Sequence, residues 1–229
     1  WPGFETESTV TYDLHELLVI QTRDALGNIV AARNDYRVLQ PSLLTDPNGN
    51  RTEVAFDTLG MVAGTAVMGK ETENKGDSLA GFIPDLDEAT LLAHLQDPIA
   101  DPHAFLQGAT TRLDYDMFAY HRTKDQPEPK AAVAYALARE THVADLGAGE
   151  LTKVRHSFSY SDGFGREIQK KLQAEPGPLV ENGPEVSPRW VGTGWTVFNN
   201  KGKPVRQFEP FFTATYGFEF DVRVGVSPI

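Results

Sequence analysis

Five short segments of the sequence share one motif, an Asp or Asn followed three residues later by Gly. They run from Asp24 to Gly27, Asp46 to Gly49, Asp57 to Gly60, Asp162 to Gly165 and Asn199 to Gly202. The side-chain oxygen at the first position accepts a hydrogen bond from a backbone N–H two residues on. The glycine supplies the positive φ with which a type I turn returns into a hairpin. The motif therefore predicts five β-hairpin turns.

Segments that alternate apolar and polar residues precede four of these turns. They read LLVIQTR before Asp24, RTEVAF before Asp57, VRHSFSYS before Asp162 and GWTVF before Asn199. Period-two alternation is typical of strands that bury one face. Recurring strand-turn-strand units indicate an array in which each unit covers the apolar face of its neighbour. We therefore expect a mainly β chain built as an antiparallel β-hairpin array.

A calcium loop is an alternative interpretation of the second and third turns. Asp46, Asn48, Asn50 and Asp57 fall at positions 1, 3, 5 and 12 of an EF-hand count, but position 6 is Arg51 and no helical pattern flanks the loop. A turn explains all five copies, whereas a metal loop explains one. The chain also has neither a Walker loop nor a G-x-G-x-x-G segment at a strand-to-helix junction. We therefore predict no metal and no cofactor.

Composition narrows the class of protein further. With 32 acidic and 21 basic residues the formal net charge is -11, which repels nucleic acid. No apolar run approaches the ~20 residues of a membrane span. The absence of cysteine excludes disulfides and thiolate metal sites, and it leaves the compartment open. The first residues, Trp-Pro-Gly-Phe, contain no initiator Met and no visible signal, as expected of an excised or mature fragment.

Longer stretches around the turns resemble a known family. YRVLQPSLLTDPNGNRTEVAFDTLGMV and FSYSDGFGREIQKKLQAEPG are similar to the Rhs or YD-repeat family, whose unit is a Tyr/Phe-x-Asp-x-x-Gly-Arg hairpin. WVGTGWTVFNNKGKPVRQFEPFF and FEFDVRVGVSPI resemble the shell-forming region of the B component of bacterial insecticidal toxin complexes. The resemblance covers about residues 12 to 229. The chain departs from the simple repeat at Asn28 and Met61, which replace the usual Arg.

This resemblance implies a structural role. In the family, YD-repeat strands spiral into a hollow β shell that encloses a toxic polypeptide, so the chain would form one arc of that wall. The implied partners are other YD-repeat segments of the same protein, the C component of the toxin complex and the enclosed toxin polypeptide. The resemblance implies a secreted or extracellular location. We expect the chain to have no enzymatic activity.

An irregular segment interrupts the array and suggests three parts. Residues 1–68 and 109–229 are expected to be YD-repeat-like β structure, with an irregular loop at 174–189, and residues 69–108 to be a loop and helical insertion. A helix is predicted at 86–96, with Asp85 as N-cap and Glu88 three residues on. A second is predicted at 102–107 after Asp101, with Gly108 past its end.

The clearest predicted strand is 216–226. Tyr216, Phe218, Phe220, Val222, Val224 and Val226 share one face at period two. The predicted strand spans about 36 Å at ~3.3 Å per residue, which suits a large sheet.

Two groups of residues suggest catalysis. Gly76-Asp77-Ser78-Leu79 matches the GDSL hydrolase tetrapeptide, with Ser78 as nucleophile, but no strand pattern precedes it and no Asp-x-x-His follows it. Glu219 with Asp221, and Asp114 with Asp116, are pairs of same-face carboxylates about 6.5 Å apart, a separation that glycosidases use. Arg223 and Arg112 are their expected ionic partners, and paired carboxylates make poor general acids. The six histidines show no metal-ligand spacing; they are His15, His94, His103, His121, His142 and His156.

Two function classes therefore remain. The first is a structural wall with no active site. The alternative is a glycan-binding β module, in which Trp190 and Trp195 would stack on sugars if they were exposed. A GDSL-type hydrolase ranks third.

Overall fold

A computed structural model describes residues 7–220, 222, 224, 225, 227 and 228 of the chain. Most of its strands form one antiparallel sheet of 12 strands in the order β1 to β10, then β13 and β16. These strands are β1 Thr9–Tyr12, β2 Val19–Arg23, β3 Ile29–Asp35, β4 Gln40–Thr45, β5 Arg51–Phe56, β6 Val62–Met68, β7 Thr111–Asp116, β8 Ala132–Arg139, β9 Val154–Ser161, β10 Glu167–Ala174, β13 Arg189–Gly192 and β16 Phe211–Thr213. The predicted mainly β, antiparallel hairpin array is confirmed.

The remaining elements are short. Two strands pair inside the expected loop, β11 Gly177–Pro178 and β12 Glu185–Val186, and a three-stranded sheet contains β14 Thr196–Phe198, β15 Pro204–Gln207 and β17 Ser227–Pro228. The helices are α1 Glu88–Gln96, α2 Pro102–Leu106, α3 Ala119–Thr123 and the 3₁₀ turn η1 Val143–Asp145. Among the described residues, no helix has the length and apolarity that crossing a bilayer would require.

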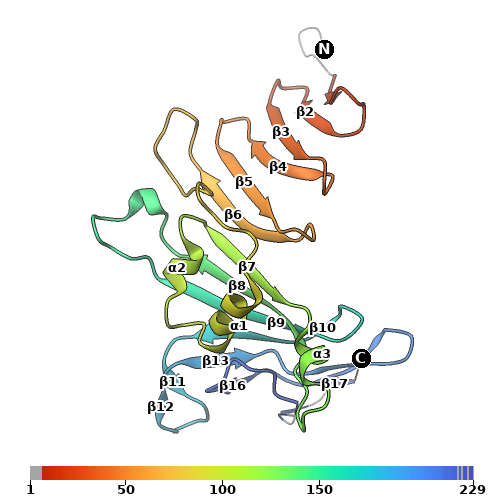
Figure 1. Ribbon diagram of the computed structural model, residues 1–229, viewed down its shortest axis with the longest axis vertical. Coiled ribbons are helices and arrows are strands. Elements are labelled where there is room, and N and C mark those ends of the chain that lie inside the picture. The colour runs from red at the N-terminus through yellow and green to blue at the C-terminus, as the bar shows by residue number, and fades with distance from the viewer. Residues whose placement is uncertain (1–6, 221, 223, 226, 229) are drawn as a thin grey trace. The chain divides into compact units, whose positions relative to one another are not determined.

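The chain divides into two compact units. Unit 1 comprises the described residues within 1–90, 97–112 and 138–154, and unit 2 comprises those within 91–96, 113–137 and 155–229. In unit 1, strands β2 to β6 lie side by side in chain order (Figure 1). The Phe82 ring covers the sheet at Gly64, where an added Cβ would lie 2.5 Å from it, and the Arg112 guanidinium lies 4.9 Å from the centroid of the same ring.

Unit 2 has an aromatic core. Phe158 lies at its centre, with ring centroids 4.4 Å from Tyr135, 4.8 Å from Tyr216 and 5.6 Å from Trp190. Tyr135 and Trp190 are completely buried, and Phe158 is almost so. Large aromatic side chains contribute most of the burial energy of such a core.

The helical insertion follows its capping residues. α2 begins after Asp101, whose carboxylate accepts the Ala104 N–H at 3.3 Å. Its C-cap is Gln107, with φ 52°, and Gly108 follows past the end of the helix. α1 is capped by Asp87 instead of Asp85: its carboxylate accepts the Thr90 N–H at 3.0 Å and the Thr90 hydroxyl at 2.6 Å. Asp85 instead accepts the Thr58 N–H at 2.9 Å. The predicted cap was therefore wrong by two residues, because both acids precede an apolar run and only the tertiary contact distinguishes them.

The predicted strand at 216–226 is wrong for the residues that the structure describes. β16 ends at Thr213, and residues 214–220, 222, 224 and 225 are outside any strand; 221, 223 and 226 lie outside the described residues. Side chains replace the expected ladder. The Glu219 N–H donates to Gln169 Oε1 at 2.9 Å, the Gln169 side-chain amide donates back to the Glu219 carbonyl at 3.3 Å, and the Tyr160 hydroxyl donates to the Tyr216 carbonyl at 2.7 Å. Tyr216 and Phe218 are therefore half-buried in unit 2 and Phe220 is exposed, and none of the three lies in a strand.

The turn glycines provide a test of this fold. Gly60 has φ +85°, and a Cβ there would lie 2.8 Å from Val38 Cγ1, whereas Gly163 is not in the left-handed region and has open space around it. We expect Gly60→Ala to lower the free energy of unfolding by about 1 to 3 kcal/mol through backbone strain. Gly163→Ala, the matched control, should change it by less than about 0.5 kcal/mol. Urea denaturation measures both, and equal effects would contradict the turn geometry.

Candidate functional site

The five predicted turns share one geometry. Gly27, Gly49, Gly60, Gly165 and Gly202 have φ between 73° and 86°. Each glycine N–H donates to the carbonyl of the Asp or Asn that opens its turn, at 2.9 to 3.1 Å. A side-chain oxygen of Asp24, Asp46, Asp57, Asp162 or Asn199 accepts the N–H of the residue four positions on, at 2.8 to 3.1 Å. All five corners therefore have the same backbone conformation and the same side-chain acceptor.

The charge of these aspartates is stabilised locally. The Asn28 side-chain amide donates to Asp24 at 2.8 Å and is the main cause of the lowered pKa of that carboxyl. The Asn50 side chain donates to Asp46 at 3.0 Å and lowers its pKa in the same way. The oxygens that a calcium ion would need at the second turn are therefore already engaged by amides. In the described part of the chain, no group of three His, Cys, Asp or Glu side chains could hold a metal ion.

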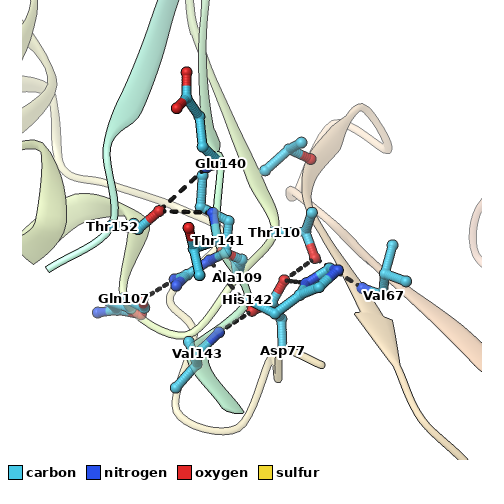
Figure 2. A network of polar contacts seen from close by, with 12 residues as sticks. Val67, Asp77, Gln107, Ala109, Thr110, Glu140, Thr141, His142, Val143 and Thr152 are labelled. Atoms are coloured by element: carbon cyan, nitrogen blue, oxygen red, sulfur yellow. Dashed lines mark hydrogen bonds and ion pairs between the residues drawn. The ribbon is translucent and has the colours of Figure 1, made fainter. Parts of the chain in front are cut away.

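The most developed polar cluster lies in unit 1 around Asp77 (Figure 2). This side chain is 5% exposed. One carboxylate oxygen accepts the Thr110 hydroxyl at 2.5 Å and His142 Nδ1 at 2.7 Å, and the other accepts the Val143 N–H at 2.8 Å. Arg139 Nε lies 3.4 Å from that second oxygen. Asp77 thus accepts three hydrogen bonds and forms an ion pair with Arg139, which together balance the cost of burying its charge.

The same cluster joins four chain segments. The Arg139 guanidinium also donates to the Ala109 and Gln107 carbonyls, both at 2.6 Å. Thr110 Oγ1 accepts the Val67 N–H at 2.8 Å, so the network reaches β6. The Thr152 hydroxyl accepts the Glu140 and Thr141 N–H groups at 3.2 and 2.9 Å (Figure 2). The insertion is therefore anchored to the sheet of unit 1 through a network of polar contacts.

The GDSL tetrapeptide contributes Asp77 to this network, whereas Ser78 takes a different position. Ser78 is exposed, its hydroxyl accepts the Ala80 N–H at 3.0 Å, and its N–H donates to the Gly108 carbonyl at 2.9 Å. Among the hydrogen bonds of the described residues, none joins the Ser78 hydroxyl to an imidazole. A nucleophile needs a base within hydrogen-bond reach, and His142 is instead bound to Asp77. Asp77 therefore orients the His142 imidazole, and this imidazole does not activate Ser78.

His142 also lines a groove in unit 1. The groove has a volume of about 600 Å³, and its apolar lining includes Val30, Leu44 and Val67. Lys75 and Asp145 contribute charges at its wall. This volume falls in the range of small-molecule pockets. Its polar lining also includes Asp46, Asn50, Arg51 and Thr52, and His142 is its single imidazole.

The first carboxylate pair predicted from the sequence is buried, and its two members contact different side chains. Asp114 and Asp116 are buried, at 4% and 8% exposure. Asp116 pairs with Arg122 at 2.5 Å, whereas His94 Nε2 lies 3.8 Å from Asp114. Both carboxylates are therefore shielded from solvent, because the neighbouring elements cover this face.

Of the second predicted carboxylate pair, only Glu219 lies in the described part of the chain. Glu219 forms an ion pair with the fully buried Lys171, and its predicted partners Asp221 and Arg223 lie outside the described residues. Burial lowers the pKa of Lys171, and the hydrogen bond to Glu219 opposes that shift. Arg112, predicted to pair with Asp114, donates to the Ile83 and Phe105 carbonyls at 3.1 and 3.2 Å.

The tryptophans and histidines take structural positions. Trp190 is completely buried, and Trp195 is half-buried, with its ring stacked 6.2 Å from Phe208. Trp190 therefore offers no flat surface to a sugar. His94 and His156 are buried, and His156 Nδ1 lies 2.6 Å from the Tyr135 hydroxyl. Burial is the main cause that raises the pKa of Tyr135, so this phenol stays protonated.

Sequence signals alone missed two of these features. The Asp77–His142 contact joins residues 65 positions apart, and no local pattern marks it. The Lys171–Glu219 pair is 48 positions apart. Lys170, Gln169 and Gln173 are polar neighbours of Lys171, so no local pattern marks this lysine as an interior cation.

Comparison with known proteins places this geometry in context. No family model and no curated protein matches the chain. Among solved structures, TcdB2-TccC3 matches 94% of the chain with a TM-score of 0.71 at 25% identity. TcdB2-TccC3 without its hypervariable C-terminal region gives 0.71 at 20%, and the Photorhabdus luminescens Tc holotoxin pore gives 0.67 at 21%, each over 94% of the chain. The chain spans 10 to 12% of the length of these solved chains.

The class of fold follows from these matches: the chain has the hairpin-array fold of toxin-complex chains. More particularly, it has the fold of a segment of the TcdB2-TccC3 chains, consistent with an Rhs or YD-repeat shell fragment. The resemblance seen in the sequence is therefore confirmed by the fold. The structural similarity supports the interpretation that the chain is a component of a toxin complex.

The Asp77 network predicts unequal effects of two neighbouring substitutions. Asp77→Ala leaves buried donors and the Arg139 charge without their acceptor, and we expect it to lower the free energy of unfolding by about 2 to 4 kcal/mol. Ser78→Ala removes one exposed hydroxyl and should change it by about 0.5 kcal/mol or less. Urea denaturation followed by circular dichroism measures the difference. A larger effect at Ser78 than at Asp77 would contradict the assigned roles.

Proposed function

We propose that the chain is a structural segment of a toxin-encapsulating Rhs or YD-repeat β shell in a secreted bacterial toxin complex. The observation that carries the proposal is the match of 94% of the chain, at a TM-score of 0.71, to a tenth of a TcdB2-TccC3 chain. A segment that matches so small a share of a larger wall acts by continuing the wall. Its proposed partners are neighbouring YD-repeat segments, the C component and the enclosed toxin polypeptide.

The strand pairing supports this role. Among the described residues, β1 pairs with β2 alone and β16 pairs with β13 alone. Each therefore has one backbone edge to which a further strand can add. A wall segment requires such an edge at each end of its sheet, and arrays of hairpins grow by adding units at their ends.

The assignment of no enzymatic activity is part of the proposal. It is supported by the Ser78 hydroxyl, which bonds to a backbone amide, and by the ion pairs of Asp116 and Glu219. The complete burial of Trp190 weighs against the glycan-binding alternative.

Hydrogen exchange tests the wall proposal. Outward-facing amides of β1 and β16 should exchange rapidly in the isolated 229-residue chain and slowly in the intact toxin complex, because only the complex supplies further strands. Amides of β3 and β4, which are paired on both sides, serve as the internal control and should be protected in both samples. Rapid exchange of β1 and β16 in both samples would overturn the proposal.

A hydrolase assay tests the absence of catalysis separately. We expect the isolated chain to show no turnover of p-nitrophenyl acetate above the rate with Ser78→Ala, since the serine has no base. The same comparison with Glu219→Gln on p-nitrophenyl glycosides should also show no difference. Turnover that either substitution abolishes would establish an active site and contradict a purely structural role.

A further inference from the structure

Large apolar side chains are exposed along one rim of unit 1. Strands β1 to β6 are antiparallel neighbours in chain order, so their connections alternate between two rims. The loops 13–18 and 36–39 and the turn 57–60 share one rim. Five side chains on it are at least half exposed, and we call them the apolar rim: Leu14 at 94%, Leu17 at 56%, Tyr36 at 50%, Leu39 at 51% and Leu59 at 75%.

The opposite rim differs. It contains the turns 24–27 and 46–49 and the loop 69–75, and Leu26 at 77% is its one exposed large apolar side chain among the described residues. Single exposed leucines are ordinary, whereas several gathered on one surface mark an interaction site. The two rims are built on the same strands, but only the turn 57–60 of the apolar rim repeats the Asp-x-x-Gly corner of the turns 24–27 and 46–49. The asymmetry therefore lies in the loops and in their side chains.

Hydrogen bonds hold the three loops of the apolar rim together. The Tyr36 hydroxyl donates to the Asp13 carboxylate at 2.5 Å, which links the first loop to the second. The Arg37 guanidinium donates to the Asp57 and Thr58 carbonyls at 2.6 and 3.1 Å, which links the second loop to the third. A rim fixed in this way loses little conformational freedom when a partner binds.

The charge around the apolar rim is acidic. Its loops carry Asp13, Glu16 and Asp57, and Asp35 lies at the end of β3. Their one Lys or Arg is Arg37, whose guanidinium is engaged by the turn carbonyls and lies 3.7 Å from Asp35. The Tyr36 hydrogen bond is the main cause of a lowered pKa at Asp13, which keeps that carboxylate charged. A partner with basic residues beside its apolar ones is therefore complementary.

The spacing of the loops favours a helix. Neighbouring strands lie about 4.8 Å apart, so loops on the same rim recur about every 9.6 Å. A helix repeats a side chain every seventh residue at about 10.5 Å, whereas a strand repeats side chains on one face at about 6.6 Å. Three loops span about 19 Å, which corresponds to about 13 helical residues.

We propose that the apolar rim of unit 1 binds an amphipathic helix whose apolar residues recur at heptad spacing between Lys and Arg residues. Leu14, Leu39 and Leu59 contact the apolar face of that helix. The exposed Glu16 and the half-buried Asp35 and Asp57 face its basic flanks. This surface is independent of the proposed wall function, because it uses loop side chains and leaves the backbone edges of β1 and β16 untouched.

A designed peptide tests the proposal. The probe is a fluorescein-labelled 21-residue helix with leucine at heptad positions and lysine beside them, titrated with the 229-residue chain and followed by fluorescence anisotropy. We expect binding that weakens at least tenfold with Leu14→Ser/Leu59→Ser. Leu26→Ser, equally exposed on the opposite rim, is the matched control and should bind as well as the unsubstituted chain. Circular dichroism and thermal unfolding confirm that the variants remain folded.

Several outcomes would overturn the proposal. These are no binding of the probe, equal binding by Leu14→Ser/Leu59→Ser, equal weakening by Leu26→Ser, or equal binding of a peptide in which glutamate replaces every lysine. A concentration-dependent rise in mass by light scattering that Leu14→Ser/Leu59→Ser abolishes would assign the rim to self-association instead. Binding to phosphatidylglycerol vesicles in place of the peptide would assign it to a lipid surface.

Discussion

The hydrogen bond from a backbone N–H to the side chain that opens each turn is the interaction on which the fold depends. At all five corners an Asp or Asn oxygen accepts the amide four residues on, while the glycine donates to the carbonyl of that same Asp or Asn. A left-handed conformation costs an L-residue about 1 to 2 kcal/mol, and glycine avoids it. Each net hydrogen bond adds about 1 kcal/mol. The corner therefore forms from five consecutive residues, and the flanking strands take their register from it.

Where no such corner exists, buried polar side chains replace the backbone ladder. In unit 1, Asp77 collects donors from Thr110, His142 and Val143 and holds the insertion on the sheet. In unit 2, Gln169 and Lys171 hold the segment after β16. These groups are buried, so each carries the large penalty of an unpaired polar atom if its partner is lost. Structure that is not set locally thus depends on contacts between residues far apart in the chain.

This division explains what the sequence could predict. The turns at Gly27 and Gly60 are local and can be recognised from five residues, and so can the helix that begins after Asp101. The strand expected at 216–226 failed because alternation reports which side chains are apolar and does not report whether a partner strand is present. The Asp77–His142 contact was missed for the same reason, since no local signal joins residues 65 positions apart. Trp190 is completely buried, so the exposure that sugar stacking requires is absent at this residue.

The insertion shows how the array accommodates a long interruption. β6 and β7 remain paired, with Gly64 opposite Arg112 and Thr65 opposite Thr111, although residues 69–110 separate the two strands. Closing a loop roughly ten times longer than a hairpin turn costs about 2 kcal/mol more, since each doubling adds about 0.6 kcal/mol. The hydrogen bonds to Asp77 and the complete burial of Leu106 and Ala109 are of sufficient size to offset that cost. The interruption is therefore tolerated because it carries its own buried anchor, and the hairpins on either side need no change in their corners.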